Sequence, residues 1–311
     1  MVDCDTLDEE VAKSLGPFQH CTSNQAIAFG ELSKPARAQV IAASLEDAHM
    51  LYAKYAPMGI EELAVEVAMV RMAIGMAQHI RGLVHVQVNP YYSYSPEKIV
   101  DNARRIVQLS QHIQPGFDTA RICIKVPSTW EGMMACRTLE LTGIHTLATT
   151  LFSMAQAVLA DEVGCTYVAP YVNELKVQVN TGLVDNAKLL PLCAAIQKYY
   201  KSINSTTKVL PASLTSVEEI FFLAGVDHLT IAPDLLAQLN RPYAGKTKSL
   251  FDMDPTLPIP ARGISFINDP GSYRITFARD QGGASQIKLT EAVNIFCDFQ
   301  DKLERLMKAA A

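Results

Sequence analysis

The stretch 121–152, RICIKVPSTWEGMMACRTLELTGIHTLATTLF, places a helical pattern between two apolar, β-branched runs. The runs at 121–127 and 145–152 have the length and composition of strands. Residues 129–141 between them repeat apolar side chains three and four positions apart, as one face of a helix does. A strand, a helix and a second strand at this spacing predict two parallel strands joined by a crossover helix, which is the unit of an α/β fold.

The same alternation continues on both sides of this stretch. Further strands are predicted at residues 82–89, 166–172, 208–214 and 228–232, and further helices at 60–80, 96–113, 153–163, 185–201 and 216–223. Two earlier strands at 1–5 and 18–23 complete a set of eight. The strands are apolar nearly from end to end, as expected when helices cover a parallel sheet.

Both a closed barrel and an open doubly wound sheet satisfy this alternation. No glycine-rich phosphate turn follows the first strand, as a dinucleotide-binding sheet requires, so we favour a (β/α)8 TIM barrel with a C-terminal helical extension. We expect residues 1–311 to form a single barrel domain. Within it, residues 242–282 are rich in Pro, Gly and Asp and are predicted to be irregular, and 288–308 form an amphipathic helix. Residues 242–311 are thus an irregular segment plus a C-terminal helix packed on the barrel.

Composition excludes several classes of partner. The chain is 49% apolar and 19% charged with a net charge of −5, which is ordinary globular composition with no basic stripe for nucleic acid. No apolar run reaches the roughly 18 residues of a membrane span, so we expect no membrane partner. The first residues are acidic where a secretory signal is basic, and the seven cysteines lack paired spacing. We therefore expect reduced thiols and a cytoplasmic protein.

Four polar side chains fall late in otherwise apolar strands: Gln87, Lys125, Thr149 and Tyr171. In a barrel the C-terminal ends of the strands face the mouth, where active sites are built. The four strands are consecutive in the prediction, so these side chains are expected to line one arc of that mouth. One polar residue per strand at this position predicts a site rather than packing.

Lys125 is the most informative of the four. Ile124 and Val126 flank it, so its amine is expected to lie in a poorly hydrated place, where burial lowers the pKa of an ammonium group. A neutral amine is what a Schiff-base nucleophile requires. On spacing alone the plainer alternative is favoured, namely a lysine that extends to solvent at the strand end or pairs with a carboxylate.

The stretch 122–132, ICIKVPSTWEG, resembles the signature of the transaldolase family, in which a strand lysine forms an imine with the substrate. The resemblance continues in order at 3–6 (DCDT), 21–25 (CTSNQ), 149–153 (TTLFS), 155–157 (AQA), 169–173 (APYVN), 210–213 (LPAS) and 223–231 (LAGVDHLTI). It covers nearly the whole chain and implies a class I aldolase on a TIM barrel.

The resemblance also implies roles for individual residues. Lys125 would add to a ketose carbonyl, and Asp5 would take the proton from the departing hydroxyl. Asp3 could stand in for Asp5, because the register of the first strand is open. Asn24 and Ser213 would bind hydroxyls of the donor, although either residue alone is as often a turn residue.

One departure from the family concerns the residues that handle water. Transaldolases usually have a glutamate where Gln87 stands and a phenylalanine where Tyr171 stands. The combination of Gln87, Thr149 and Tyr171 instead resembles the fructose-6-phosphate aldolase branch, where these residue types position a water. A tyrosine can exchange protons there if the nearby Lys125 lowers its pKa. Transaldolases pass a three-carbon unit to an aldehyde, whereas the aldolases release or take up free ketone.

A second departure concerns the substrate. Family members generally bind a sugar phosphate with an arginine after the Tyr/Phe strand and a basic residue after the next strand, and here those positions hold Glu174 and Thr215. A carboxylate repels phosphate, and Lys176 could compensate only as a point charge. We therefore expect a ketol donor of the dihydroxyacetone type and an aldehyde acceptor that is not a simple sugar phosphate.

Two alternatives stay open. One is an ordinary transaldolase of the pentose phosphate pathway, acting on sedoheptulose 7-phosphate and glyceraldehyde 3-phosphate. The other is a catalytically silent barrel with a binding or regulatory role, which the retention of Lys125, Asp5 and Thr149 argues against. The seven histidines lack metal-binding spacing, and an imine mechanism needs no metal or cofactor, so none is predicted. The resemblance implies a homo-oligomer.

Overall fold

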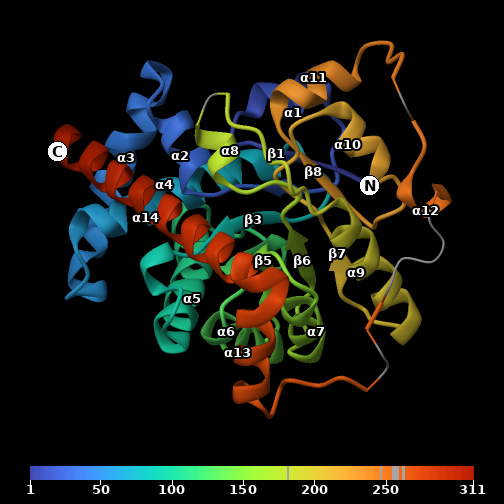
Figure 1. Ribbon diagram of the computed structural model, residues 1–311. Coiled ribbons are helices and arrows are strands. Elements are labelled where there is room, and N and C mark those ends of the chain that lie inside the picture. Colours follow the sequence, from blue (N-terminus) through green and yellow to red (C-terminus); the bar gives the residue numbers. More distant parts are fainter. Residues whose placement is uncertain (181, 246, 254–258, 261–262) are drawn as a thin grey trace.

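The computed structural model describes residues 1–180, 182–245, 247–253, 259–260 and 263–311 (Figure 1). Its centre is a parallel sheet in the order β7-β6-β5-β4-β3-β2-β1-β8. The strands are β1 (Val2–Asp5), β2 (Cys21–Thr22), β3 (Val84–Gln87), β4 (Ile122–Pro127), β5 (His145–Leu151), β6 (Tyr167–Pro170), β7 (Lys208–Val209) and β8 (Leu229–Ile231).

The sheet closes on itself. β1 pairs in parallel with both β2 and β8, and the remaining neighbours are parallel as well. On the other side of β8, the backbone amides of His228 and Thr230 donate to the carbonyl oxygens of Val209 (3.0 Å) and Pro211 (3.3 Å). These two bonds join the last strand to the end of β7. The fold is therefore the predicted (β/α)8 barrel, not an open sheet.

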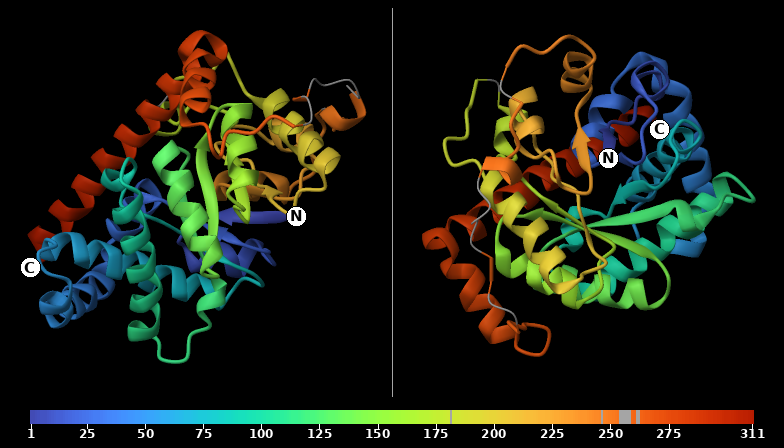
Figure 2. Two further views of the ribbon diagram at one scale, coloured as in Figure 1. Left: turned by 90° about the horizontal axis from the view of Figure 1, so that it is seen from below. Right: turned by 90° about the vertical axis from the view of Figure 1, so that its right-hand side faces the viewer.

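Helices surround the barrel on its outer face (Figure 2). They are α1 (Glu9–Leu15), α2 (Gln25–Leu32), α3 (Ala38–Tyr55), α4 (Ile60–Ala77), α5 (Pro96–Ile113), α6 (Trp130–Leu141), α7 (Met154–Glu162), α8 (Lys176–Val179), α9 (Leu190–Ile203), α10 (Val217–Phe222), α11 (Pro233–Leu239), α12 (Leu250–Met253), α13 (Pro270–Arg279) and α14 (Ala284–Ala310).

Local sequence explains where many of these helices begin. Ser95 caps α5 by accepting a hydrogen bond from the amide of Lys98, and Pro96 occupies the first turn. Ser153 and Gln156 form a capping box at the start of α7. α9 begins at Leu190, later than the predicted residue 185. The carboxylate of Asp185 instead accepts from the amides of Glu174 and Ala187, which holds this part of the chain in a loop.

The C-terminal region differs from the prediction in one respect. Residues 246, 254–258 and 261–262 of the segment expected to be irregular lie outside the described residues, but 270–279 form α13. Asp269 caps this helix through the amide of Ser272, and Pro270 is tolerated in its first turn. The expectation of an irregular chain there is wrong, because the Pro and Asp are helix-start residues. α14 crosses the barrel as predicted, and Ser285 ties it to the carbonyl oxygen of Phe152 (3.1 Å) (Figure 1).

The barrel interior contains polar side chains at two levels. Asp5, Gln87, Lys125 and Tyr171 lie toward the C-terminal ends of their strands. A second group, which we call the lower polar layer, lies nearer the N-terminal ends and is fully or nearly fully buried; it consists of Asp3, His20, His85, Tyr167 and His228. The chemistry of the two levels is therefore separated by position along the strands. No helix in the described part of the chain has the length and apolarity that crossing a membrane requires.

Candidate active site

A pocket of about 380 Å³ opens at the C-terminal ends of the strands. The polar side chains that line it come from seven different chain segments: Asp5, Asn24, Lys125, Tyr171, Gln178, Ser213 and Thr230. Its other walls are mainly apolar and include Ile27, Leu175, Val179, Leu214 and Phe299. Since α14 supplies Phe299, the last helix of the chain takes part in the site.

Lys125 is buried within this pocket and is only 2% exposed. Its Nζ donates to the carbonyl oxygen of Ser23 (3.3 Å), and in the described residues no carboxylate lies within 4.0 Å of it. Burial lowers the pKa of Lys125, and the negative charge of Asp5 opposes that shift. The side chain neither reaches solvent nor forms an ion pair. Both simpler alternatives, a lysine that extends to solvent and a lysine paired with a carboxylate, are therefore wrong. The environment favours a neutral amine.

Asp5, rather than Asp3, lines the pocket. Its Oδ1 accepts from Thr22 Oγ1 (2.6 Å), and Thr22 Oγ1 lies 2.5 Å from Thr230 Oγ1. An ionised carboxylate only accepts, so when Asp5 is ionised the Thr22 proton points to Asp5 and Thr230 donates to Thr22. Burial raises the pKa of Asp5, while the positive charge of Lys125 and the bond from Thr22 oppose the shift. Asp5 is thus a carboxylate of increased basicity.

Thr22 and Thr230 were missed in the sequence. Both lie in strands, in the segments CTSNQ and HLTI, where a polar side chain interrupts apolar residues. That signal is the same one that singled out Thr149. It is weak at Thr22 and Thr230 because β2 and β8 are only two and three residues long.

Gln87 lies beside Lys125 in the parallel register of β3 and β4. It is 2% exposed, and both polar atoms of its side chain are buried without a hydrogen-bond partner in the described structure. Gln87 and Thr149 are not among the residues that line the pocket. A buried amide with its donor and acceptor both available is suited to hold a small polar partner behind the pocket wall.

Thr149 and Tyr171 are brought together by an irregularity in β5. The pairing of β5 with β6 shifts between Ala148 and Leu151, and Thr150 adopts a φ of 53°, which a β-branched residue rarely does. Thr149 Oγ1 then donates to the hydroxyl of Tyr171 (3.4 Å). Burial raises the pKa of Tyr171, so the condition named for proton exchange, a pKa lowered by Lys125, is not met. The phenol therefore keeps its proton, which remains available for donation.

Asn24 and Ser213 both line the pocket and also shape the backbone. Asn24 Oδ1 accepts from the amide of Ile27 (3.0 Å) and caps α2, which leaves its NH2 group to face a ligand. Ser213 has a φ of 60°, and its hydroxyl accepts from Gln178 Nε2 (3.3 Å). Each residue therefore combines the turn role and the pocket position that the sequence left as alternatives.

The structure does not bring Glu174, Lys176 and Thr215 into the pocket wall. Glu174 pairs with Lys176 (2.6 Å), and Lys176 lies 3.3 Å from Glu291. Thr215 donates through its amide (2.7 Å) and hydroxyl (2.9 Å) to Glu219. Among the described residues that line the pocket, Lys125 is the one cation.

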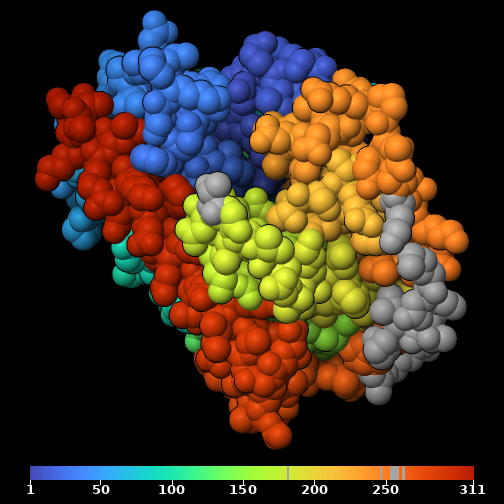
Figure 3. All heavy atoms as spheres, turned by 45° about the horizontal axis from the view of Figure 1, so that its top comes forward, coloured from blue at the N-terminus to red at the C-terminus, as the bar shows by residue number. Residues whose placement is uncertain are grey.

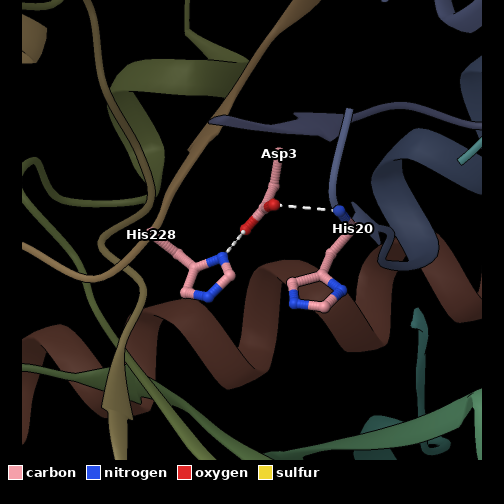
Figure 4. Close-up of side chains that lie close together, drawn as sticks. All are labelled: Asp3, His20 and His228. Carbon is pink, nitrogen blue, oxygen red and sulfur yellow. Dashed lines mark hydrogen bonds and ion pairs between the residues drawn. The ribbon is translucent and has the colours of Figure 1, made fainter. Parts of the chain in front are cut away.

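The lower polar layer contains a geometric candidate for a metal site (Figure 4). Asp3, His20 and His228 offer ligand atoms that lie within 4.8 Å of one another. His20 Nδ1 accepts from the amide of Leu83 (2.8 Å), so in the neutral ring Nε2 carries the proton and faces the hydroxyl of Tyr167 (3.0 Å). His20 then has no lone pair left for an ion.

Asp3 is engaged in the same network. Its two oxygens accept from the backbone amide of His20 (2.9 Å) and from His228 Nδ1 (2.9 Å) (Figure 4). These contacts form a structural hydrogen-bond network rather than an open set of metal ligands. No local sequence pattern indicates this network, because residues 3, 20 and 228 meet only when the barrel closes.

Comparison with known proteins places the chain among similar sequences. A family model described as Transaldolase/Fructose-6-phosphate aldolase matches residues 2–262. The transaldolase of Schizosaccharomyces pombe is 30% identical over 325 residues, covering 99% of this chain and 95% of that protein. The transaldolase of Methylibium petroleiphilum is 29% identical over 320 residues, covering 99% and 96%. Transaldolase A of Escherichia coli K12 is 32% identical over 236 residues, covering 74% and 72%.

Proposed function

Because the chain belongs to the transaldolase/fructose-6-phosphate aldolase family, we propose that it makes and breaks carbon–carbon bonds through an imine on Lys125. The chain is an enzyme of this family, and a small sugar is its class of substrate. The observation that carries the proposal is the buried amine of Lys125, whose pKa is lowered, in a pocket that it shares with Asp5.

The first step is addition of the neutral amine to the carbonyl carbon of a ketose. The nitrogen lone pair forms the new bond, and the carbonyl oxygen takes a proton to become a hydroxyl. Loss of that hydroxyl as water gives a protonated imine. We assign Gln87, Thr149 and the neutral phenol of Tyr171 to hold the water that carries these protons. Gln87 is paired with Lys125 in the register of β3 and β4, and Thr149 is bonded to Tyr171 in the pocket wall.

The second step is cleavage of the carbon–carbon bond. Asp5 takes the proton from the hydroxyl on the carbon that leaves, and that carbon becomes the carbonyl of an aldehyde. The electron pair of the broken bond moves to the protonated imine, which becomes an enamine. The NH2 group of Asn24 and the hydroxyl of Ser213 are placed to orient donor hydroxyls.

The fate of the enamine distinguishes transfer from release. Attack on a second aldehyde reverses the cleavage step and transfers the three-carbon unit. Protonation of the enamine carbon, followed by hydrolysis, releases dihydroxyacetone. We assign the proton donation for that release to the neutral phenol of Tyr171. This assignment supports an aldolase outcome, as in the branch that Gln87 and Tyr171 resemble.

The pocket supports an acceptor without a phosphate group. Lys125 is the one cation among the described lining residues, and Asp5 adds a negative charge. The two positions where relatives bind phosphate hold Glu174, which is paired with Lys176, and Thr215, which is bonded to Glu219. We propose a polyhydroxylated or otherwise uncharged aldehyde as the acceptor. Phosphate recognition normally uses paired arginine donors, which these residues do not supply.

A second candidate is an ordinary transaldolase that uses sedoheptulose 7-phosphate and glyceraldehyde 3-phosphate. The comparisons favour it at least as well, since the yeast and Methylibium transaldolases match 99% of the chain. The two candidates share the imine and differ in the charge of the substrate.

Borohydride trapping tests the imine. Incubation with fructose or dihydroxyacetone and borohydride is expected to add an irreversible mass at Lys125, located by peptide mass spectrometry. Lys125→Met removes the adduct. Asp5→Asn keeps the adduct with dihydroxyacetone, which needs no cleavage, but lowers turnover of a cleavable ketose by about 100-fold or more. A wild-type protein that gains no mass with these ketoses or with their phosphates would reject the proposal and leave the silent barrel.

Substrate profiling separates the two candidates. The proposed specificity predicts that kcat/KM with free glyceraldehyde as acceptor exceeds that with glyceraldehyde 3-phosphate. The ordinary transaldolase predicts the reverse order. Efficient consumption of sedoheptulose 7-phosphate would refute the uncharged acceptor while leaving the imine intact.

A further inference from the structure

Residues 174–180 and 182–189 lie between β6 and α9 in the chain and form part of the roof of the pocket; we call them the roof segment. Leu175, Gln178 and Val179 of this segment line the pocket. Gln178 Nε2 also reaches across to the hydroxyl of Ser213 and the carbonyl oxygen of Leu214, both at 3.3 Å. Where the roof segment lies therefore determines the shape of the pocket at the mouth.

Hydrogen bonds donated by backbone amides hold the two ends of the roof segment together. The carboxylate of Asp185, which is buried, accepts from the amide of Glu174 (2.9 Å) and the amide of Ala187 (2.7 Å). The amide of Leu189 donates to the carbonyl oxygen of Val172 (2.8 Å). These bonds close the segment on itself. Gln178 attaches it to Ser213 and Leu214, and Lys188 attaches it to α10 by donating to Glu219 Oε1 (2.7 Å).

A further attachment comes from α14, which lies against the roof segment (Figure 3). Lys288 on α14 points its Nζ to Glu174 Oε1 (3.7 Å) and donates to the carbonyl oxygen of Ala187 (3.4 Å). It thus contacts both ends of the segment. A second, outer pair joins Lys176 to Glu291 of α14 (3.3 Å).

The two lysines differ in burial, and that difference separates their roles. Lys288 is 5% exposed, whereas Lys176 is 36% exposed. A buried ammonium is tolerated only where carboxylate and carbonyl oxygens compensate for lost hydration, so removal of one partner is costly. An exposed pair is screened by solvent and contributes little. We therefore expect the loss of Lys288 to disturb the roof segment more than the loss of Lys176.

We propose that Lys288 and Glu174 form an ionic clamp that holds the roof segment over the pocket, which makes Lys288 a positioning residue for the part of the substrate remote from Lys125. The position where relatives carry a phosphate-binding arginine is thereby used for an internal contact. The catalytic consequence rests on the proposed function, but the clamp itself does not.

The test compares Lys288→Met, which keeps the length of the side chain and removes its charge, with the wild-type protein. Amide hydrogen exchange measured by mass spectrometry is expected to accelerate about tenfold or more at 174–180 and 182–189, with no change in the strands. With free glyceraldehyde as acceptor, KM is expected to rise about tenfold. The rate of borohydride trapping at Lys125 by dihydroxyacetone stays within about twofold.

Matched variants make the test decisive. Lys176→Met removes the exposed lysine that shares Glu174 and is expected to change exchange and KM by less than about twofold. Glu174→Gln keeps the shape of the other partner and should reproduce the Lys288→Met effects, which covers the case where Lys288→Met does not fold.

Amide exchange at the wild-type rate in Lys288→Met and Glu174→Gln, or in the one of them that folds, would overturn the clamp. Accelerated exchange with an unchanged KM would overturn the positioning role. A wild-type protein that fails to trap dihydroxyacetone would reject the proposed function, and the exchange measurement would still decide on the clamp.

Discussion

Lys125 and Tyr171 line the same pocket, and burial favours the neutral form of both groups. For Lys125 the result is an amine with a lone pair, and for Tyr171 it is a phenol that keeps its proton. The hydroxyl of Tyr171 accepts from Thr149, so its own proton is free to point to another acceptor. A nucleophile and a proton donor are thus produced by the same physical effect.

The role of this phenol can be measured. Tyr171→Phe is expected to lower kcat for ketose cleavage by about tenfold or more, because the proton donor is lost while the ring remains. The ratio of transfer to release should rise in assays with a second aldehyde. Tyr167→Phe is the matched control, since Tyr167 lies on β6 below the pocket and contacts His20 instead. Equal kcat in wild type and Tyr171→Phe would remove Tyr171 from the mechanism.

A single site residue was predictable when it was a polar side chain within an otherwise apolar strand. Lys125 and Tyr171 interrupt apolar strands, and both line the pocket. Glu174, Thr215 and Lys176 were expected at the substrate, and they lie away from the pocket wall. Their partners explain why: Glu174 meets Lys288, which is 114 residues away in the chain, and no local pattern encodes that contact.

At the level of elements, one buried ion pair joins α4 to α5. Glu66 on α4 accepts two bonds from Arg105 on α5, at 2.5 and 2.7 Å, and a third from Asn102 at 2.8 Å. Burial raises the pKa of Glu66 to about 7, against the attraction of Arg105. The carboxylate is therefore tolerated only because three donors face it.

Loss of the cation from this pair should be costly. Arg105→Met is expected to lower the free energy of unfolding by about 3 kcal/mol, because Glu66 remains buried with a single donor. Urea denaturation at pH 8 would measure the change. The double variant Glu66→Met/Arg105→Met, which removes both charges, should recover most of the loss. If the double variant were as unstable as Arg105→Met, packing rather than charge would explain the effect.

Elements with a clear local signal, such as a helix cap or an apolar run, were predicted better than the others. The strands around Lys125 and the helices with clear caps, such as those after Ser95 and Ser153, occur where the sequence placed them. α1, α2 and α3 were not predicted, and α3 buries only a narrow stripe that includes Ile41 and Leu45. β2 and β7 have two residues each, so barrel closure rather than local composition defines them.

For the molecule as a whole, the lower polar layer makes stability depend on pH. Burial lowers the pKa of His20 to about 4 and that of His85 well below its usual value. Both rings are neutral in the folded protein near neutral pH, whereas in the unfolded chain they titrate near the ordinary pKa of about 6.5. Below that pH the unfolded chain binds more protons at these sites, so their contribution to stability falls as pH decreases.

His85 is the residue to test, because its two ring nitrogens have no partner in the described structure and its replacement removes no hydrogen bond. Between pH 6.5 and 5, His85→Leu should reduce the slope of unfolding free energy against pH by up to about 1.4 kcal/mol per unit. Urea denaturation at four pH values gives the slope.

Glu66 provides the internal comparison for this measurement. Its raised pKa acts with the opposite sign, since the folded protein binds that proton first as pH falls from about 7. Glu66→Gln should therefore steepen the same slope that His85→Leu flattens. Parallel slopes for wild type and His85→Leu would show that His85 is protonated in the folded state too.

The bond between Asp3 and His228 joins the first strand to the last, and this sets an order of events during synthesis. A ribosome delivers Asp3 and Asp5 at once, but His228 emerges only after more than two hundred further residues. Until then Asp3 lacks the imidazole that bonds its carboxylate in the folded protein, and β1 cannot be enclosed without cost. The nascent chain therefore cannot assemble its reactive centre early. A polypeptide that ends before β8 cannot close its barrel. We expect cellular proteases to degrade such a chain.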